Sequence, residues 1–340
     1  MFKAKYFWVM ALVVLSMVLT QCTPAATPAA PTQAPTAAKT YKLAAILPGV
    51  ITDADYNTLA YVGISELEKA TGIKTAYSES VPVPDVDRAM REYIDSGFNI
   101  IWTHGGQFVN QTVELARQFP DVEFIAEGDA PVNNPPANLW FIDRNFQVGF
   151  YAIGALAAKQ TKTGKIGYIG GQTLPFSYAE VHAIQQALKD MNSTADLKTV
   201  WVGDFNDPTK ARQVADALIG EGCDVLMGSL NLGMFGVFES VKAASTKIWV
   251  TAKYTDKTAY APANYLTSVL YDFSGPLKDI VGKIQAGEKS GYYPLGFATG
   301  VALQSPLKNV APEVQSEMDA IVADLKSGKI QVVKDISEVK

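Results

Sequence analysis

The chain has few of the residues on which metal centres and disulfide scaffolds depend. Its 340 residues include two histidines and two cysteines. His104 and His182 are far apart in the sequence, so they offer little for a histidine-rich metal site. Two cysteines cannot build a disulfide framework or a four-cysteine zinc site. The formal net charge of −5 argues against nucleic-acid binding, which needs a basic surface. We therefore expect no metal, no cofactor and no nucleic-acid partner.

Enzyme motifs are also scarce. The segment 164–171 is rich in glycine but lacks the Lys-Ser/Thr end of a phosphate-binding loop, and its glycines flank an expected strand. A G-x-S-x-G elbow is absent, and neither histidine has a nucleophile partner nearby in sequence. We expect no enzymatic activity, and a strand-end turn near a ligand cleft at 164–171. His104, at another strand end, is either a cleft-lining residue or a satisfied loop histidine.

The N-terminus has the pattern of a secretion signal. Lys3 and Lys5 precede an apolar run over 7–19, which is too short to span a bilayer, since spanning takes about 20 residues. Such a run suits the core of a signal peptide. It ends at Cys22 and is similar to a bacterial lipobox, although Gln21 stands where a small residue is usual. We predict lipidation at Cys22 and a location on the extracytoplasmic face of the cell membrane; ordinary secretion is the alternative.

A Pro/Ala/Thr-rich segment follows the predicted signal peptide of residues 1–21. Residues 22–40 bury too little apolar surface to fold, so a tether is predicted there. After processing, Cys223 is the only unmodified cysteine. It precedes an apolar strand, so we expect a buried, inert thiol.

From Tyr41 onward, short apolar runs alternate with segments of helical periodicity. The expected strands are 43–47, 75–77, 100–103, 123–126, 165–169, 198–202, 225–228, 248–251 and 263–270. The expected helices are 57–70, 84–97, 108–119, 147–161, 178–192, 209–221, 235–244, 276–287 and 312–326. This alternation predicts parallel sheets with right-handed crossovers.

The alternation restarts after the long helix 147–161, which predicts two lobes. The fold class is therefore α/β, with two doubly wound parallel-sheet lobes and a hinged cleft between them. Lobe I is expected to comprise 41–145 plus 262–293, and lobe II 146–261 plus 294–340. The hinge segments are expected around 143–147, 253–263 and 294–302.

Two strand-to-helix turns combine an aromatic ring with polar side chains. One turn is Asp53-Ala54-Asp55-Tyr56-Asn57, and the other is Gly203-Asp204-Phe205-Asn206-Asp207. Two rings facing each other across a cleft can hold a flat heteroaromatic ligand, and each stacked ring contributes about 1–3 kcal/mol. Asp207 is also expected to cap the helix that begins at Pro208. Asp53 offers the alternative of a helix cap or an Asx turn.

The second turn carries a family resemblance. The run Gly203–Lys210 resembles the G-D-F-x-D-x-x-K signature of the basic membrane protein (BMP) family of ABC-transporter substrate-binding lipoproteins, which are similar to purine-nucleoside receptors. The runs 53–57, 119–124, 150–158, 162–167 and 265–268 resemble further motifs of that family, and the likeness covers 41 to about 335. The resemblance implies a type I periplasmic binding protein-like fold. It also implies a monomer that delivers a purine base or nucleoside to an ABC permease in the membrane.

The resemblance also implies the ligand-binding residues. Tyr56 and Phe205 would stack on the ligand, while Asp53 and Asn57 would bind its edges. The residues expected to bind ligand are Asp53, Tyr56, Asn57, Asn110, Phe205, Asp207, Thr251 and Tyr271.

Three positions depart from the family pattern. Thr251 (or Ala252) stands in place of an aspartate, Tyr271 in place of a lysine, and Asn110 in place of an acid. The first two departures remove groups that bind sugar hydroxyls, which suggests a free purine base, with bulk from Trp249, Tyr254 and Tyr271 where the sugar would lie. Two alternatives remain open: another flat heterocycle such as riboflavin in the same fold, or a surface receptor or sensor without transport.

Overall fold

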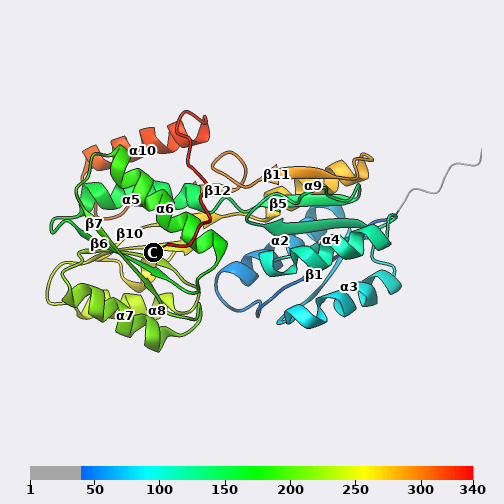
Figure 1. The fold of residues 1–340 in the computed structure, drawn as a ribbon, viewed down its shortest axis with the longest axis horizontal. Helices are drawn as coiled ribbons and strands as arrows, with labels where there is room; N and C mark the ends of the chain where they lie inside the picture. Colours follow the sequence, from blue (N-terminus) through cyan, green and yellow to red (C-terminus); the bar gives the residue numbers. More distant parts are fainter. Residues whose placement is uncertain (1–39, 340) are drawn as a thin grey trace, which may run out of the picture. The chain divides into compact units, whose positions relative to one another are not determined.

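The computed structural model describes residues 40–339, which contain two six-stranded sheets (Figure 1). From Tyr41 onward the described chain forms one compact unit. The predicted signal peptide, the lipidation at Cys22 and nearly all of the predicted tether lie outside the described residues.

The first sheet has the strand order β11-β5-β4-β3-β1-β2, and all of its neighbouring strands pair in parallel. Its strands are β1 (Lys42–Ile46), β2 (Lys74–Ser78), β3 (Ile100–Thr103), β4 (Glu123–Gly128), β5 (Leu139–Asp143) and β11 (Gly291–Pro294). The helices around it are α2 (Tyr56–Thr71), α3 (Val86–Asp95), α4 (Val109–Gln118) and α9 (Ser274–Gln285), with short 3-10 turns η1 (Val83–Asp85) and η2 (Gly106–Phe108).

The second sheet has the order β12-β10-β9-β8-β6-β7 and is parallel except for β12, which is antiparallel to β10. Its strands are β6 (Lys165–Gly170), β7 (Asp196–Trp201), β8 (Val225–Ser229), β9 (Trp249–Tyr254), β10 (Tyr265–Tyr271) and β12 (Val301–Leu303). Its helices are α5 (Gln147–Gln160), α6 (Pro175–Asp190), α7 (Pro208–Gly220), α8 (Met234–Ala243) and α10 (Pro312–Lys326), with the 3-10 turn η3 (Thr258–Tyr260).

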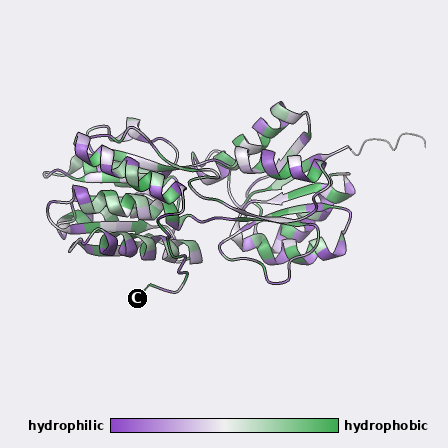
Figure 2. Ribbon diagram, turned by 90° about the horizontal axis from the view of Figure 1, so that it is seen from above, coloured by the Kyte–Doolittle hydropathy of each residue, from purple (hydrophilic) through white to green (hydrophobic). Residues whose placement is uncertain are grey.

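Helices cover both faces of each sheet, which is why the central strands are almost continuously apolar. In β1, Leu43 and Ala45 pack on one side with α2 and α9, while Ala44 and Ile46 pack on the other with α3 and α4. The second sheet packs α7 and α8 on one face and α5 and α6 on the other. Figure 2 shows the hydrophobic residues concentrated in the strands between the helix layers.

The predicted fold class is confirmed, and most of the expected elements are present within a few residues. Strands β5, β11 and β12 were not expected. β11 is a four-residue edge strand that contains Pro294, and β12 is three residues long. Such short segments carry little periodicity of their own, and their pairing partners are far away in sequence.

The chain passes between the two sheets at a different place from the one expected. β10 pairs in parallel with β9, so it belongs to the second sheet rather than to lobe I. The chain crosses after β10, because the next helix, α9, packs on α2. The three crossing segments are therefore 143–147, 271–274 and 294–301. The expected hinge at 253–263 is wrong, since that loop joins two strands of one sheet.

None of the helices in the described part of the chain combines the length and the apolar character that crossing a bilayer requires.

Candidate functional site

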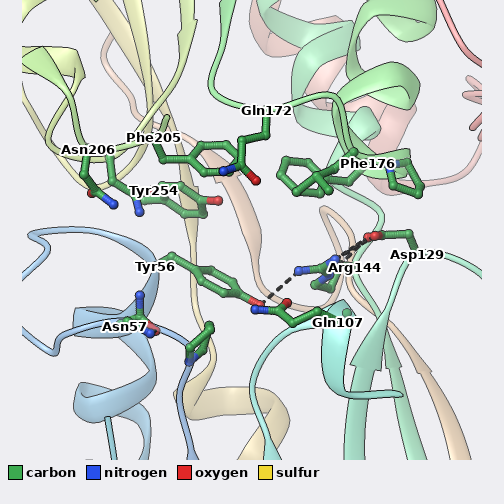
Figure 3. Close-up of a pocket in the computed structure, with 16 residues that line it drawn as sticks. Tyr56, Asn57, Gln107, Asp129, Arg144, Gln172, Phe176, Phe205, Asn206 and Tyr254 are labelled. Atoms are coloured by element: carbon green, nitrogen blue, oxygen red, sulfur yellow. Dashed lines mark hydrogen bonds and ion pairs between the residues drawn. The ribbon is translucent and has the colours of Figure 1, made fainter. Parts of the chain in front are cut away.

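A cavity of about 590 Å³ opens between the carboxyl ends of the two sheets (Figure 3). The first half lines it with the loops after β1, β3, β4 and β5, and the second half with the loops after β6, β7 and β8 and the end of β9. In open parallel sheets these strand ends are the usual location of a ligand site. The cavity was thus expected in this position, and its walls come from both halves.

Tyr56, the first residue of α2, lines the cavity, and its ring is held in place by contacts on the side away from the cavity. One face stacks on His104, with the ring centroids 3.7 Å apart and the planes 25° from parallel. The Tyr56 hydroxyl donates to Glu127 Oε2 at 3.0 Å and accepts from Arg144 Nη1 at 3.0 Å. Figure 3 shows Phe205 on the opposite side of the cavity from Tyr56, with Tyr254 between them, 5.8 Å from Tyr56 between ring centroids.

Glu127, fully buried, is the centre of the hydrogen bonds under that ring. Its Oε1 accepts from Trp102 Nε1 at 2.9 Å and bonds to His104 Nδ1 at 2.8 Å. His104 Nε2 lies 3.0 Å from the backbone oxygen of Tyr56. Of the two roles considered for His104, the structure shows a buried histidine with both ring nitrogens bonded, which supports Tyr56 and does not itself line the cavity.

Arg144 and Asp129 supply the charged groups of the cavity wall and neutralise each other. Arg144 Nε and Nη2 donate to Asp129 Oδ1 at 3.1 and 2.8 Å, and Nη2 also donates to Oδ2 at 2.7 Å. Burial opposes the charge on Arg144, but the neighbouring Asp129, Tyr56 and Glu127 raise its pKa above the ordinary value. The guanidinium carbon also lies 5.3 Å from the centre of the Phe176 ring. The wall is thus polar without a net charge.

Phe205 is held in place by a glycine on the neighbouring strand end. A Cβ atom at Gly171 would lie 2.1 Å from Phe205 Cδ1, so only glycine lets the ring approach this closely. The Phe205 ring also stacks with Phe176, at 6.1 Å between centroids and 21° between planes. Gly171 directly follows β6, so the strand-end turn predicted for this segment is confirmed.

Amide side chains supply most of the remaining polar groups: Asn57, Gln107, Gln172, Asn206 and Asn231. Asn57 accepts from Gly49 N at 3.1 Å and donates to Asp53 Oδ2 at 2.8 Å. Gln107 and Gln172 are exposed and line the cavity. Amides both donate and accept, so this lining can match a ligand edge that carries both kinds of group.

Three of the predicted ligand-binding residues, Tyr56, Asn57 and Phe205, line this cavity. Asp53 lies next to it, but its two oxygens accept from the backbone N–H groups of Asp55, Asn57 and Thr58. Asp53 therefore has the role that the sequence offered as an alternative to ligand binding, a helix cap or Asx turn at the start of α2.

The other predicted residues lie outside the lining. Asp207 caps α7 by accepting from Lys210 N at 3.0 Å, and that bond holds the pKa of its carboxyl below the usual range. Asn110 is exposed on α4. Thr251 is fully buried within β9. Tyr271 is buried and donates to Phe146 O at 3.3 Å. These four assignments are not carried into the proposal below.

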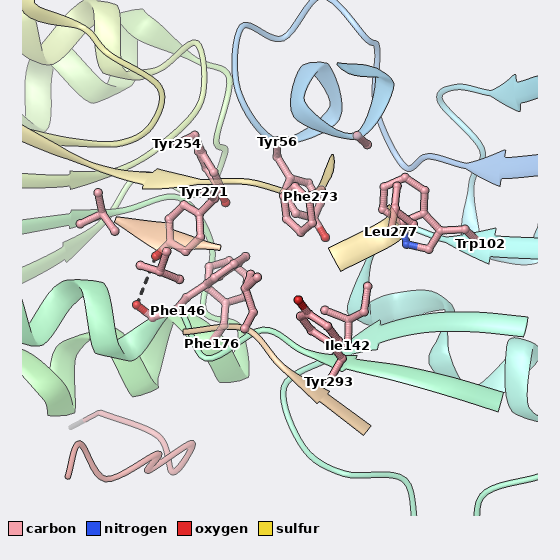
Figure 4. Close-up of a cluster of buried hydrophobic side chains, with 14 of the residues drawn as sticks. Tyr56, Trp102, Ile142, Phe146, Phe176, Tyr254, Tyr271, Phe273, Leu277 and Tyr293 are labelled. Carbon is pink, nitrogen blue, oxygen red and sulfur yellow. Dashed lines mark hydrogen bonds between the residues drawn. The ribbon is translucent and has the colours of Figure 1, made fainter. Parts of the chain in front are cut away.

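Aromatic side chains form a wall on the second-half side of the cavity, and Figure 4 shows Tyr254 and Tyr271 of this wall within a cluster of buried hydrophobic side chains. Tyr254 lines the cavity at the end of β9 with a φ of 76°, an uncommon conformation for a tyrosine. Tyr271 and Phe146 pack behind it, at 5.5 and 6.1 Å between ring centroids. Of the three residues from which bulk was expected, Tyr254 lines the cavity, Tyr271 packs behind it, and Trp249, at the other end of β9, does not line it.

A buried ion pair lies behind this wall. Lys253 Nζ donates to Glu180 Oε1 at 2.5 Å, and both side chains are fully buried. Tyr168 donates to the other Glu180 oxygen at 2.7 Å. Lys253 Nζ lies 4.1 Å from the centre of the Phe146 ring and 4.7 Å from those of Phe176 and Tyr254. Burial raises the pKa of Glu180 and lowers that of Lys253, while their mutual attraction opposes both changes.

The sequence analysis missed several of these residues. Arg144 follows β5, a strand that was not expected, and its partner Asp129 follows β4 on a separate loop. Phe176 lies in the first turn of α6, directly after the Leu-Pro pair at 174–175. The sequence does show a polar or aromatic residue soon after a strand end at each of these positions. That pattern alone does not indicate which loops come together at the cavity.

Cys223 is fully buried, as predicted, and burial raises the pKa of its thiol to about 11. Within the described residues, His, Cys, Asp and Glu do not gather in a group of three that could hold a metal ion.

Comparison with known proteins gives the family. The chain is 26% identical over 300 residues to basic membrane protein A of Borreliella burgdorferi, covering 86% of this chain and 87% of that protein. It is 27% identical over 271 residues to a purine-binding protein of Brucella abortus, covering 78% and 75% of the two chains.

Among solved structures, an ABC transporter solute-binding protein of Conexibacter woesei superposes with a TM-score of 0.70 at 24% identity, covering 88% of this chain and all of that one. A solute-binding protein of Aeropyrum pernix gives a TM-score of 0.74 at 16% identity, covering 86% and 93% of the two chains. These neighbours share the two-lobed fold of type I periplasmic binding proteins. Residues 40–335 match the family described as PnrA-like ABC transporter substrate-binding proteins, and the chain belongs to that family.

Proposed function

We propose that this protein is an extracytoplasmic receptor that binds a purine, with a preference for the free base, and delivers it to an ABC permease. The observation that carries the proposal is the pair of rings, Tyr56 and Phe205, on opposite sides of one cavity. A flat heterocycle between them would gain about 1–3 kcal/mol from each ring. Tyr56 is suited to this role because His104 and Glu127 already hold its ring in place.

The charges of the cavity favour a neutral ligand. Arg144 and Asp129 are paired with each other at 2.7 Å. A charged ligand would lie close to one like charge and would lose its hydration without gaining a free counter-ion. A neutral ring with N–H donors and ring-nitrogen acceptors loses less, because Asp129 and the surrounding amides can pair with both kinds of group.

Aromatic bulk supports a base over a nucleoside. The rings of Tyr271 and Phe146 pack against Tyr254, and the three rings occupy the space beside the end of β9. Charged side chains are strong partners for sugar hydroxyls, but the two charged groups behind this wall, Lys253 and Glu180, are fully buried and bonded to each other. The purine-binding relative from Brucella abortus supports the ligand class.

Membrane delivery is supported by the family and by the N-terminal sequence. Substrate-binding proteins of ABC systems work with a permease. The predicted lipidation at Cys22 would hold the protein at the extracytoplasmic face of the membrane. In this proposal residues 41–143 plus 274–294 are one lobe and 147–271 plus 301–339 are the other, and the three crossings between them are the hinge for closure around a ligand.

A thermal-shift screen tests the ligand. The protein would be unfolded and refolded to remove carried-over ligand, then melted with adenine, guanine, hypoxanthine, their nucleosides, riboflavin, simple sugars and amino acids. A ligand at a hundred times its Kd adds about 2.7 kcal/mol to the free energy of unfolding. A rise in Tm with bases alone supports the proposal. If nucleosides raise the Tm as much as bases do, the preference for the base is removed. A rise in Tm with riboflavin alone, or no rise with any purine, overturns the ligand class.

A further inference from the structure

A second set of contacts joins the two halves beside the cavity. On the first half, Asp53 and Asp55 lie in the loop between β1 and α2; on the second, Thr255 and Lys257 lie in the loop between β9 and β10. Lys257 Nζ donates to Asp55 Oδ1, and Thr255 Oγ1 lies 3.1 Å from the same oxygen. Asn231, from the loop after β8, donates to Asp53 Oδ2 at 3.3 Å. We call these five residues the clasp.

The charged pair of the clasp is buried although its partners come from different halves. The side chains of Lys257 and Asp55 are 2% and 1% exposed. A buried charge is costly unless its partner is present, so each of these charges needs the other half in place. If the halves separate, both return to water and the pair is lost. The contact therefore depends on the closed arrangement in a way that a surface ion pair does not.

The clasp is linked to both sides of the ligand cavity. Asp55 directly precedes Tyr56, and Asp53 holds Asn57 through Oδ2. On the second half, Asn231 itself lines the cavity, and Thr255 directly follows Tyr254. Closing the clasp consequently fixes the segment that carries Tyr56 against the segment that carries Tyr254.

We propose that Asp55 and Lys257 are positioning residues that hold the two halves closed over the cavity and thereby slow the release of ligand. Neither residue lines the cavity, so they act through the arrangement of the halves and not by touching the ligand. The clasp favours closure in the ligand-free protein as well. Because a closed cleft must open before a bound molecule can leave, weakening the clasp raises the dissociation rate.

Single and double substitutions in the clasp should have different effects on the closure of the two halves. Lys257→Met leaves the Asp55 carboxylate without its partner in the closed form, and Asp55→Asn does the same to the Lys257 ammonium. Either change favours the open arrangement. The double variant Asp55→Asn/Lys257→Met removes both charges, and with them the cost of burying an unpaired one. We expect it to return toward the wild type, which a purely additive effect would not do.

The test uses the purified protein, first without ligand and then with the purine that gives the largest thermal shift. Small-angle X-ray scattering should show a larger radius of gyration for each single variant than for the wild type. Stopped-flow measurements should show ligand dissociation faster by about tenfold or more, with the double variant closer to the wild type. Lys278→Met is the matched control, since its 2.9 Å ion pair with Glu66 is exposed and joins α2 to α9 on one half.

Two outcomes overturn the proposal: single variants that scatter like the wild type, or dissociation rates that do not change. A melting curve for each variant checks that it is folded; if a single variant does not fold, Thr255→Val, which removes one bond to Asp55 and leaves the charges, takes its place. The scattering result needs no ligand. It thus tests the clasp even if purines do not bind, and purine binding with an inactive clasp leaves the proposed function standing.

Discussion

The ring of Tyr56 lies on the imidazole of His104, with 3.7 Å between ring centroids, and this contact fixes one side of the ligand cavity before any ligand arrives. The hydroxyl of the same tyrosine links Glu127 to Arg144. The stacking surface and the charged wall are thus parts of one hydrogen-bonded unit. A pre-formed surface of this kind lowers the entropy cost of binding, because fewer side chains are ordered by the ligand.

Tyr56→Phe tests that unit. The change keeps the ring but removes the bonds to Glu127 Oε2 and Arg144 Nη1, which lie in a buried environment. We expect the free energy of unfolding to fall by about 1–3 kcal/mol, measured by urea denaturation, with a smaller loss of purine affinity than in Tyr56→Ala. An unfolding free energy equal to that of the wild type would show that the hydroxyl does not support the site.

Phe205→Ala tests stacking directly. Removal of one of the two rings should cost about 1–3 kcal/mol of purine affinity, which is roughly 5- to 150-fold in Kd, as measured by calorimetry. Tyr77→Ala is the control, since Tyr77 is a partly exposed aromatic residue on edge strand β2, away from the cavity. Equal affinities for Phe205→Ala and the wild type would remove Phe205 from the site.

Gly171→Ala tests the position of the Phe205 ring without deleting it. The added Cβ would lie 2.1 Å from Phe205 Cδ1, so the ring must move. We expect purine affinity to fall by about tenfold or more, which corresponds to roughly 1.4 kcal/mol. Gly220→Ala is the matched control because a Cβ there meets nothing within 4 Å. If both variants bind as the wild type does, the glycine has no part in positioning the ring.

Lys253→Met tests the buried pair behind the aromatic wall. The substitution leaves the Glu180 carboxylate buried without its ammonium partner. Breaking such a pair costs about 3–5 kcal/mol, so thermal and urea unfolding should both show a marked loss of stability. Glu180→Gln/Lys253→Met, which removes both charges, should be less destabilised than the single variant. A double variant that is less stable than Lys253→Met would contradict this account.

Lys257→Met should extend the pH dependence of ligand binding above pH 7. In the wild type, burial raises the pKa of Asp55 to about 7, against the lowering effect of Lys257 and with a smaller rise from Asp53. Without Lys257, the pKa of Asp55 in the closed form rises further, whereas in the open form the carboxyl is in water. The closed form then binds the proton more tightly, so closure is favoured at low pH and lost as pH rises through the closed-state pKa.

The measurement is purine affinity between pH 5 and 8 by calorimetry. We expect the affinity of Lys257→Met to fall with rising pH by up to about tenfold per unit, and the fall to continue above pH 7, where that of the wild type levels off. Asp55→Asn/Lys257→Met lacks the titrating group and should show no such dependence. Parallel profiles for Lys257→Met and the double variant would show that Asp55 does not take up the proton.

Local patterns in the sequence were enough to predict the class of fold. Apolar runs such as 43–47 alternate with helical periodicity because each central strand is covered on both faces. The cap at Asp207 is also a local feature, and the residues around Cys223, Tyr56 and Phe205 were enough to place the thiol beside a buried strand and the two rings at strand ends.

Only the tertiary structure decided which distant residues meet. Lys257 is 202 positions from Asp55 in the sequence. Arg144 is 15 positions from Asp129 and lies on a different loop. The sheet that β10 joins likewise depends on its pairing with β9 and β12. A charged side chain in a sequence looks the same whether water or a buried partner will surround it, because that choice depends on which strand ends the fold brings together. The alternation of strands and helices thus came from the sequence alone, whereas the neutralised wall and the clasp came from the assembled sheets.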